Sequence, residues 1–347
     1  MTTPTKPIPE EENANLFQMQ NAIRSNAIQN DAGKEEKEMI QVPVLSMAPM
    51  EGVTTRVYRE AFRRHFTGVD RYYTPFLAAT HTHHFKQREK REIEPYTENL
   101  VPQILTGSSE DFIWAAKYLR EKGYREVNLN TGCPYPTVFT KGKGAGMLQD
   151  PGRLDAFLDK VFSENDMPGI SLKTRIGITD PSETEVLAEI FAGYPFAEVI
   201  VHPRVREEYY TGNVHREAYE VFREKLHCPV AWNGDIKSPE DADKLLREYP
   251  GTGHIMIGRA LISDPSLARQ IRGGGELTDK ELRDFLEDLR LSYAEVLFGE
   301  RDVLFKMKEI WSYLGGRFAK YQRALLDIKK SKTIEEYQDA LNIILEK

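Results

Sequence analysis

The feature that most constrains the fold is an alternation of short apolar runs with helical patterns from residue 42 onward. Eight runs of four to eight residues occur, at 44–50, 71–75, 101–106, 126–130, 169–176, 198–202, 230–233 and 253–258. Strands that alternate with helices predict a parallel sheet with right-handed crossovers. Their number and the chain length favour an α/β fold closed into a (β/α)8 TIM barrel. No G-x-G-x-x-G follows the first run, which argues against an open dinucleotide-binding sheet.

Helix-start signals occupy several of the intervals between these runs. Ser109 opens one helix, Pro151 starts a second, and Ser238 before Pro239 caps a third. These residue types suit the first turn of a helix, because Ser satisfies an unpaired N–H there and Pro has none.

The chain changes character after the three glycines at 273–275. From Thr278 onward it shows helical periodicity without strand-like runs, as at Leu282, Phe285, Leu286 and Leu289. We therefore expect a flexible acidic leader over 1–39, a barrel over 40–274, and a separate all-helical domain over 275–347. Within the leader, 14–28 has an amphipathic helical pattern.

Composition excludes several classes of protein. No stretch approaches the roughly 18 apolar residues of a membrane span, and residues 1–39 lack the apolar core of a signal peptide. Two cysteines are too few for a disulfide framework. These observations predict a cytoplasmic protein.

Charge is distributed unevenly. The chain has a net charge of −7, which argues against indiscriminate nucleic-acid binding. Residues 301–332, in contrast, hold nine Lys or Arg against three Asp or Glu, a net charge of +6. This segment is either a solvated helix face or a surface for a polyanion.

Polar or glycine-containing segments lie at the ends of the runs, where a barrel of this type places its functional groups. They are Ala48-Pro49-Met50, Gln103, Asn130 to Pro134, Lys173-Thr174-Arg175, His202, Asn233-Gly234-Asp235 and Gly258-Arg259. Small turns after the last two runs leave backbone N–H groups free for a phosphate. Asn233, Gly234, Gly258 and Arg259 therefore predict a phosphate cradle.

Two residues at these ends are chemically distinctive. Lys173 lies in an otherwise apolar run, where an ammonium is costly unless it pairs with an acid or contacts a ligand. Cys133 lies between Gly132 and Pro134 in a loop, where its thiol can serve as a general acid. The glycine-rich run at 140–146 predicts a mobile lid that delivers this thiol.

Other candidate residues favour structural roles. Cys228, beside Pro229, is expected to be a small buried hydrophobe. His81, His83 and His84 lack carboxylates or cysteines at ligand spacing, so we expect a polar loop and no metal.

In chain order, five motifs resemble those of the tRNA-dihydrouridine synthase family. They are Ala48-Pro49-Met50-Glu51-Gly52-Val53-Thr54, Asn130-Thr131-Gly132-Cys133-Pro134 with Val138, Lys173-Thr174-Arg175-Ile176-Gly177, His202-Pro203-Arg204-Val205-Arg206 with Tyr210 and Gly212, and Asn233-Gly234-Asp235-Ile236. The resemblance covers residues 44–271, and the N-x-G-C-P element with its downstream glycines is the most diagnostic part. It implies an FMN-binding catalytic barrel at 40–274 and a helical RNA-binding domain at 275–347.

The resemblance also implies an activity and a set of roles. An FMN-dependent oxidoreductase would reduce the C5–C6 double bond of specific uridines in tRNA, with NADPH as electron donor. FMN would contact Ala48, Pro49, Met50, Gln103, Lys173 and His202, and its phosphate would contact Asn233, Gly234, Asp235, Gly258 and Arg259. Asn130, Arg175 and Tyr210 would hold the uracil after it leaves its stack. Cys133 would protonate C5 while reduced FMN gives a hydride to C6. The basic helices would bind the RNA backbone, and neither a membrane nor a metal is implied; for the oligomeric state we expect a monomer.

The chain departs from the family pattern at Thr55, where Asp is frequent, at Val205 and Glu208, and around 306–311, where an Arg-Lys-His element is missing. These departures leave the catalytic groups in place, and they leave open which uridine and which RNA are modified. One alternative is an FMN-dependent barrel reductase of a free small molecule such as a pyrimidine, which would not need the basic helices. A second is a non-catalytic RNA-binding barrel, against which Cys133, Lys173 and Arg175 argue.

Overall fold

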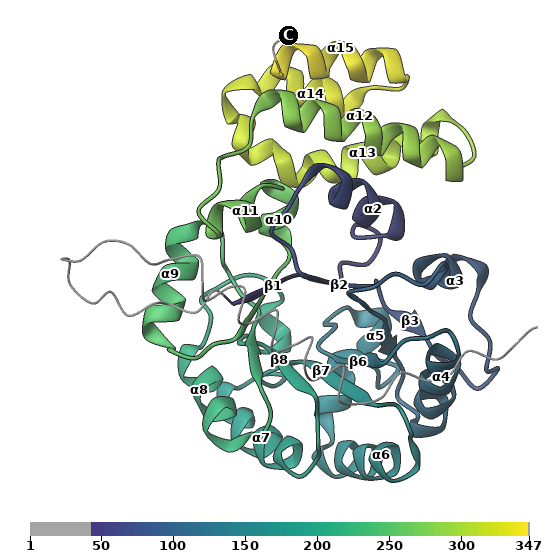
Figure 1. The fold of residues 1–347 in the computed structure, drawn as a ribbon, viewed down its shortest axis with the longest axis vertical. Helices are drawn as coiled ribbons and strands as arrows, with labels where there is room; N and C mark the ends of the chain where they lie inside the picture. The colour runs from purple at the N-terminus through teal and green to yellow at the C-terminus, as the bar shows by residue number, and fades with distance from the viewer. Residues whose placement is uncertain (1–42, 346–347) are drawn as a thin grey trace, which may run out of the picture. The chain divides into compact units, whose positions relative to one another are not determined.

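The computed structural model describes residues 43–345, in which parallel strands form a ring inside a layer of helices (Figure 1). The expected leader at 1–39, with its amphipathic stretch, lies outside the described residues. No helix among the described residues is long and apolar enough to cross a membrane.

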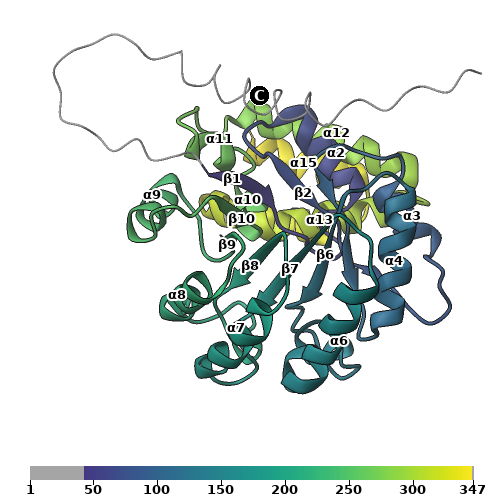
Figure 2. The same ribbon diagram turned by 60° about the horizontal axis from the view of Figure 1, so that its bottom comes forward.

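All eight expected strands are present, and every strand pairing is parallel (Figure 2). The strands are β1 (Val44–Met47), β2 (Arg71–Tyr73), β3 (Leu77–Ala78), β4 (Leu100–Val101), β5 (Gln103–Leu105), β6 (Glu126–Thr131), β7 (Gly169–Arg175), β8 (Glu198–His202), β9 (Val230–Trp232) and β10 (His254–Ile257). Their spatial order is β3-β5-β6-β7-β8-β9-β10-β1-β2-β4.

The barrel closes through the third expected strand, which the structure divides into β4 and β5. Pro102 separates them because it has no N–H to continue the ladder. β4 pairs with β2 and β5 pairs with β6, so one continuous stretch of chain joins the two ends of the strand order. The short β3, which the sequence did not predict, adds to β5 through Leu77 and Ile104.

Helices cover the outside of the strands and make up the C-terminal part of the described chain. They are α2 (Arg56–His65), α3 (Gln87–Ile93), α4 (Ser109–Glu121), α5 (Pro136–Phe139), α6 (Pro151–Glu164), α7 (Thr184–Ala192), α8 (Arg216–Lys225), α9 (Pro239–Glu248), α10 (Arg259–Ser263), α11 (Leu267–Ile271), α12 (Asp279–Val296), α13 (Glu300–Leu314), α14 (Gln322–Lys330) and α15 (Ile334–Ile344). The three predicted helix starts are confirmed by α4, α6 and α9. At α9 the Ser238 side chain accepts a hydrogen bond from the Asp241 N–H.

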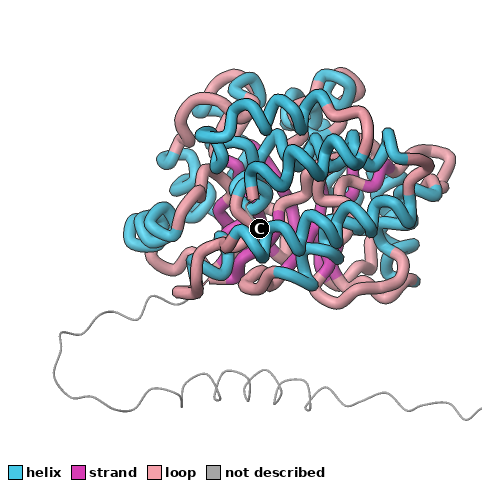
Figure 3. The backbone as a smooth tube through the Cα atoms, turned by 90° about the horizontal axis from the view of Figure 1, so that it is seen from above, coloured by secondary structure: helices cyan, strands magenta, loops and turns pink. Residues whose placement is uncertain are grey.

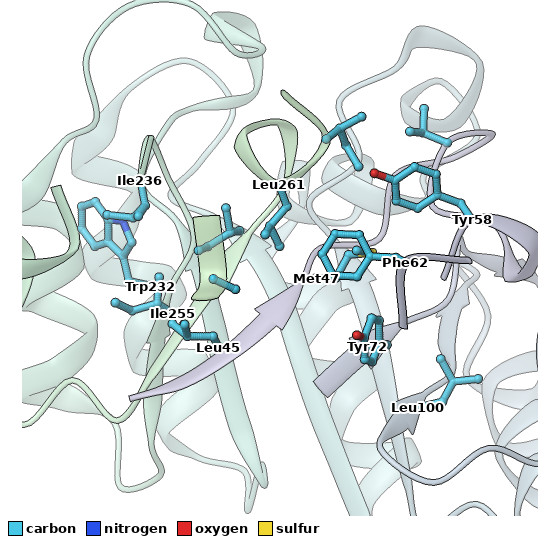
Figure 4. Close-up of a cluster of buried hydrophobic side chains, with 14 of the residues drawn as sticks. Leu45, Met47, Tyr58, Phe62, Tyr72, Leu100, Trp232, Ile236, Ile255 and Leu261 are labelled. Atoms are coloured by element: carbon cyan, nitrogen blue, oxygen red, sulfur yellow. The ribbon is translucent and has the colours of Figure 1, made fainter. Parts of the chain in front are cut away.

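Side chains alternate between the two faces of each strand, as a pleated backbone requires. Those that point outward pack against the helices, as Figure 4 shows for Met47 beside Phe62 of α2, with Leu261 of α10 nearby. Six of those that point inward form a small apolar layer, made of Ala48, Tyr73, Val101, Ile200, Ala231 and Met256.

Below this layer the barrel interior is charged. Arg71, Glu126, Glu198 and His254 are the first residues of their strands. Arg71 lies 3.6 Å from both carboxylates, and His254 Nδ1 lies 2.8 Å from Glu198. Buried and half-buried groups of opposite charge therefore pair at the amino ends of the strands, and the carboxyl ends remain open for a site.

The C-terminal helices, seen from above in Figure 3, confirm the expected change to helix after residue 278. Phe285 of α12 packs edge-on against Tyr58 of α2 with ring centroids 5.7 Å apart. Asp288 of α12 lies 2.9 Å from Arg64 and 2.8 Å from His65. These helices pack on the barrel within one unit, and a separate domain with its boundary at 274 stays a prediction.

Candidate active site

A cavity of about 990 Å³ opens at the carboxyl ends of the barrel strands. The residues that line it include all those that the sequence assigned to a site: Ala48, Pro49, Met50, Gln103, Asn130, Cys133, Lys173, Arg175, His202, Tyr210, Asn233, Gly234, Asp235, Gly258 and Arg259. The structure thus brings the predicted residues together, and their individual roles stay predictions.

The loop after β6 holds Cys133 at the cavity wall. Asn130 Oδ1 accepts hydrogen bonds from the N–H groups of Gly132 at 3.0 Å and Cys133 at 2.9 Å. On the other side, the Cys133 carbonyl accepts a hydrogen bond from the Ala145 N–H at 3.0 Å. Because the loop is held at both its N–H groups and its carbonyl, the thiol has a defined position relative to the cavity.

The expected mobile lid is wrong for Gly144, Ala145 and Gly146, which are buried against the Cys133 loop, whereas residues 140 to 143 are exposed or half-buried. Residues 144–148 are buried and belong to the 3₁₀ helix Gly144–Gln149. Gly144 has a φ of +56°, and a Cβ there would lie 2.9 Å from the Cβ of Cys133. Glycine permits both this conformation and this close approach. This part of the run packs against the loop and supports it.

The surroundings of Cys133 keep its thiol protonated. Burial raises the pKa of this thiol, and the Tyr135 N–H with the charges of Arg175 and Lys173 opposes the rise only in part. A proton is therefore available at neutral pH. The same two cations would stabilise the thiolate that remains after the proton leaves.

Lys173 is a desolvated cation on β7. Burial, reinforced by the charge of Arg175 and opposed by Cys133, lowers the pKa of its ammonium to about 7. No carboxylate among residues 43–345 is close enough to act on this pKa, so the strand-end ion pair is not the arrangement found. Part of the side chain stays accessible inside the cavity. Its position fits the alternative, a cation that contacts a ligand.

Arg175 connects the Cys133 loop to the loop after β8. It is 1% exposed, and it donates hydrogen bonds to the carbonyls of Gly132 at 3.0 Å, Val205 at 2.9 Å and Tyr209. Its guanidinium also lies over the Tyr210 ring, 5.4 Å from the centroid. Three of the five N–H groups of a guanidinium are thus used within the protein, and the others remain for a ligand.

His202 is a neutral imidazole at the end of β8. Burial, together with the charges of Arg175, Lys173, Arg204 and Arg259, lowers its pKa well below the ordinary value. Its Nε2 lies 3.2 Å from Arg204 Nη1. Because a guanidinium only donates, Nε2 accepts and the imidazole proton resides on Nδ1.

Arg204 also lines this cavity; it belongs to the motif that follows His202, and the sequence predicted no role for it. It is 1% exposed and binds the carbonyls of Thr211 at 3.0 Å and Gly212 at 2.7 Å. It also pairs with Asp235, which lies 3.5 Å from Arg259. Burial would raise the pKa of Asp235, but its hydrogen bond to Arg204 and the nearby cations lower it. As an anion, Asp235 is placed to orient Arg259 at the predicted phosphate position.

The predicted phosphate cradle lies where α10 begins. The first N–H groups of a helix have no partner within it, and those of α10 follow directly on Gly258. A Cβ at Gly258 would lie 3.4 Å from the Cβ of Ala48, so this turn packs closely against the loop after β1. Asn233 is fixed nearby, since its Nδ2 donates to the Met256 carbonyl at 2.9 Å.

The cavity wall also contains residues that no sequence pattern indicated. Ser312 and Tyr313 come from α13, and Phe76 and Tyr135 come from loops of the barrel. The position of α13 is fixed in part by Lys306, which donates to the Gly52 carbonyl at 2.7 Å. A contact between such distant segments depends on how the helices dock and leaves no local signal in the sequence.

The basic segment at 301–332 divides into two groups of cations. Three contact other parts of the protein: Lys306 at Gly52, Lys308 at the Ser331 carbonyl, and Arg317 at Asp264, 3.2 Å away. The others are exposed, and they are Arg301, Lys320, Arg323, Lys329, Lys330 and Lys332; of these, Arg323 lies 3.8 Å from Asp327 of its own helix. The exposed group remains available to a polyanion.

Two other sequence features lie away from the cavity. The loop with His81, His83 and His84 is exposed, as expected, and the His83 ring stacks on Trp114 with centroids 5.2 Å apart. Cys228 is half-buried and packs against the core, so it is less buried than expected, and its structural role stays a prediction.

Comparisons with known proteins find similarity to dihydrouridine synthases. The family model described as "Dihydrouridine synthase (Dus)" matches residues 46–332. A tRNA-dihydrouridine synthase B from Shewanella oneidensis is 30% identical over 78% of this chain and 86% of its own length. The same enzyme from Pseudomonas aeruginosa is 30% identical over 78% and 83%. A tRNA-dihydrouridine(16) synthase from Neisseria meningitidis is 24% identical over 90% and 97%.

Proposed function

This chain belongs to the dihydrouridine synthase family, and from that premise we propose that it reduces specific uridines of tRNA to dihydrouridine with FMN as its cofactor. One observation carries the proposal. Cys133, whose thiol stays protonated through burial, and Lys173, which has no acidic partner within residues 43–345, line the same cavity at the carboxyl ends of a barrel. That pairing suits the transfer of a proton beside a reduced flavin.

The cavity fits FMN in size and in chemistry. Its volume of about 990 Å³ lies at the upper end of the range for cofactor sites. Lys173 would face the flavin ring, where its charge favours the anionic reduced form. The first N–H groups of α10, Gly258 and Arg259 would hold the phosphate. When bound, FMN supplies the hydride for C6 of uracil.

Cys133 supplies the other half of the reaction. Its Sγ gives a proton to C5 as the C5–C6 π bond breaks, and the thiolate that remains is stabilised by Lys173 and Arg175. A proton from solvent then restores the thiol. NADPH would return two electrons to the cofactor in a separate half-reaction, so that electrons and protons balance.

The substrate requires two further functions. A uridine must leave its stack to enter the cavity, and Asn130, Arg175 and Tyr210 line the space where its ring would lie. The exposed cations of the C-terminal helices would bind tRNA phosphates. A cytoplasmic location and a monomeric state belong to the same proposal.

The test is nucleoside mass spectrometry of tRNA that lacks dihydrouridine, after incubation with the protein, FMN and NADPH. Wild-type protein should form dihydrouridine, and Cys133→Ala should bind FMN normally while turnover falls about 100-fold or more. Cys228→Ala, which removes the other thiol, is the matched control and should keep wild-type turnover. Reduction of a free pyrimidine in place of tRNA would contradict the proposal in favour of a small-molecule reductase.

A further inference from the structure

A chain of hydrogen bonds crosses the barrel interior from its charged base to the Cys133 loop. Ser171 Oγ donates to Glu126 at 2.7 Å, and Asn128 Nδ2 donates to Ser171 Oγ at 3.0 Å. Gln103 Nε2 donates to Asn128 Oδ1 at 2.8 Å, and Asn130 Nδ2 donates to Gln103 Oε1 at 2.7 Å. The chain ends at Asn130 Oδ1, which accepts from the backbone of the Cys133 loop.

Strand register brings these side chains together. Gln103 on β5 pairs with Asn128 on β6, and Asn128 pairs with Ser171 on β7. Partners in a parallel sheet point to the same side, here the barrel interior. Asn128 and Ser171 are 0% exposed and Gln103 is 1% exposed, so water does not compete for their hydrogen bonds.

The groups at the two ends of this series of hydrogen bonds fix the direction in which each bond is donated. Glu126, paired with Arg71 at 3.6 Å, acts as a carboxylate and only accepts. The backbone N–H groups of Gly132 and Cys133 at the other end only donate. If one amide inverted, two acceptors or two donors would meet, and the conflict would pass to each neighbour in turn.

We propose that Asn128 and Ser171 are positioning residues for the active site, through which Glu126 fixes the orientation of the Gln103 amide and of the Cys133 loop. Neither residue lines the cavity, whereas Gln103, Asn130 and Cys133 do. The Gln103 amide uses one of its N–H groups and one lone pair of its oxygen in these hydrogen bonds. Its second N–H group and second lone pair remain for a ligand in the cavity. The direction of the bonds decides where its donor and its acceptor meet a ligand.

This inference rests on the proposed function in one respect, that Gln103 faces the flavin. The hold on the Cys133 loop does not depend on the cofactor. The two consequences can therefore be measured separately, one by FMN affinity and the other by thiol reactivity in the apoprotein.

The first experiment compares Ser171→Ala with Ser46→Ala. Both hydroxyls are 0% exposed, and each makes one short bond to a charged cluster, Ser171 to Glu126 at 2.7 Å and Ser46 to His254 at 2.6 Å. Ser171→Ala should weaken FMN binding about tenfold, because Asn128 loses its acceptor and the direction of the amides is then held from the Cys133 loop alone. Ser46→Ala should keep the FMN dissociation constant within about twofold of wild type, although both variants lose stability to a similar extent.

The apoprotein provides a readout without flavin. Alkylation by iodoacetamide, followed site by site with mass spectrometry, should be at least about threefold faster at Cys133 in Ser171→Ala than in wild type. Cys228 is an internal control whose rate should not change, and Ser46→Ala should alter neither rate. Equal effects of the two serine variants on FMN affinity and on Cys133 would overturn the inference.

A second variant, Asn128→Asp, tests the direction of the bonds. One oxygen of the new carboxylate still accepts a hydrogen bond from Gln103. The other oxygen faces Ser171, whose only O–H already donates to Glu126, so that contact has no proton. When the introduced carboxyl is protonated, its O–H donates to Ser171 and the original direction returns. The ratio of its FMN dissociation constant to that of wild type should therefore approach one at pH 5.5 and rise about tenfold at pH 8.5.

The ratio is used because the charged and titratable groups around these hydrogen bonds are the same in the variant and in wild type. They are Glu126 on β6, Arg71 on β2, Glu198 on β8, His254 on β10 and Lys173 on β7. A ratio that is the same at both pH values would contradict the proposal. If wild-type protein bound no FMN, the proposed function would fail, and Cys133 alkylation would still decide this inference.

Discussion

Replacement of Lys173 by methionine should make the apoprotein more stable and remove its ability to bind FMN. The ammonium of Lys173 has no acidic partner among the described residues, and burial lowers its pKa to about 7. A residue held in this way destabilises the folded chain until a ligand contacts it. Methionine keeps the length of the side chain and removes the charge.

The magnitude follows from the change in pKa. A drop from 10.5 to about 7 corresponds to about 5 kcal/mol when the side chain is charged in both the folded and the unfolded states. Part of the Lys173 side chain is accessible to water in the cavity, which reduces this penalty. We therefore expect Lys173→Met to raise the free energy of unfolding of the apoprotein by about 2–3 kcal/mol at pH 7.

The sign of the pH dependence is also fixed. Between pH 7 and about 10.4 the unfolded chain binds more protons at this position than the folded chain, so wild-type stability rises with pH. The advantage of methionine should therefore be largest below pH 7 and shrink towards pH 10. Urea unfolding of flavin-free protein at pH 7 and pH 9 measures it, with Lys237→Met, an exposed lysine at the same cavity, as the control.

Two results would refute this reasoning. One is a variant less stable than wild type at pH 7, and the other is an advantage that does not decrease at pH 9. Added FMN should reverse the order of stability, because a ligand that binds only the folded wild type raises its free energy of unfolding by mass action. The Lys237→Met control should stay within about 0.5 kcal/mol of wild type throughout.

Three further predictions concern other parts of the site. The double variant Lys329→Glu, Lys330→Glu should weaken tRNA binding in a filter assay. The slope of log affinity against log salt concentration should fall by about one for each phosphate that is no longer neutralised. An unchanged slope would exclude these residues from the RNA-binding surface. Arg175→Leu should reduce the free energy of unfolding, measured with urea, by about 3 kcal/mol or more, because three carbonyls lose their hydrogen-bond donor. A smaller loss would mean that water donates to these carbonyls in place of the guanidinium. Gly144→Ala should lower turnover on tRNA severalfold while FMN affinity changes less than about twofold. The reason is that the new Cβ would be strained at a φ of +56° and would lie 2.9 Å from the Cβ of Cys133. Equal losses of turnover and FMN affinity would show that the strain spreads beyond the loop.

Local patterns predicted the fold because each expected strand is an apolar run, and the sequence changes to a polar or helical pattern at both ends of it. The starts of α4, α6 and α9 follow from caps, which act over three or four residues. The division at Pro102 was missed, although proline is a local signal, because apolar residues continue on both sides of it, at Leu100 and Val101 and at Ile104 and Leu105. The short β3 depends on pairing with β5, and no local pattern encodes that partner.

The site was predictable to the extent that barrel topology places strand ends together. Lys173 and Cys133 stood out because each is unusual in its local setting. The lid was misread because a glycine that allows motion and a glycine that allows close packing look the same in a sequence; Gly144 is of the second kind. The hydrogen-bond chain through Asn128 depends on register between three strands, which hydrophobic patterns do not specify.

The packing of the C-terminal helices determines how tRNA and small-molecule substrates can be distinguished. Deletion of residues 278–347 would uncover Tyr58, which packs against Phe285, and remove Tyr313 from the cavity wall. Activity would then disappear whichever substrate is used, so deletion does not separate the two hypotheses. Lys329 and Lys330 are exposed on α14, away from these residues. Reversal of their charge leaves the cavity intact, so an enzyme for a free pyrimidine would keep its turnover and an enzyme for tRNA would lose it.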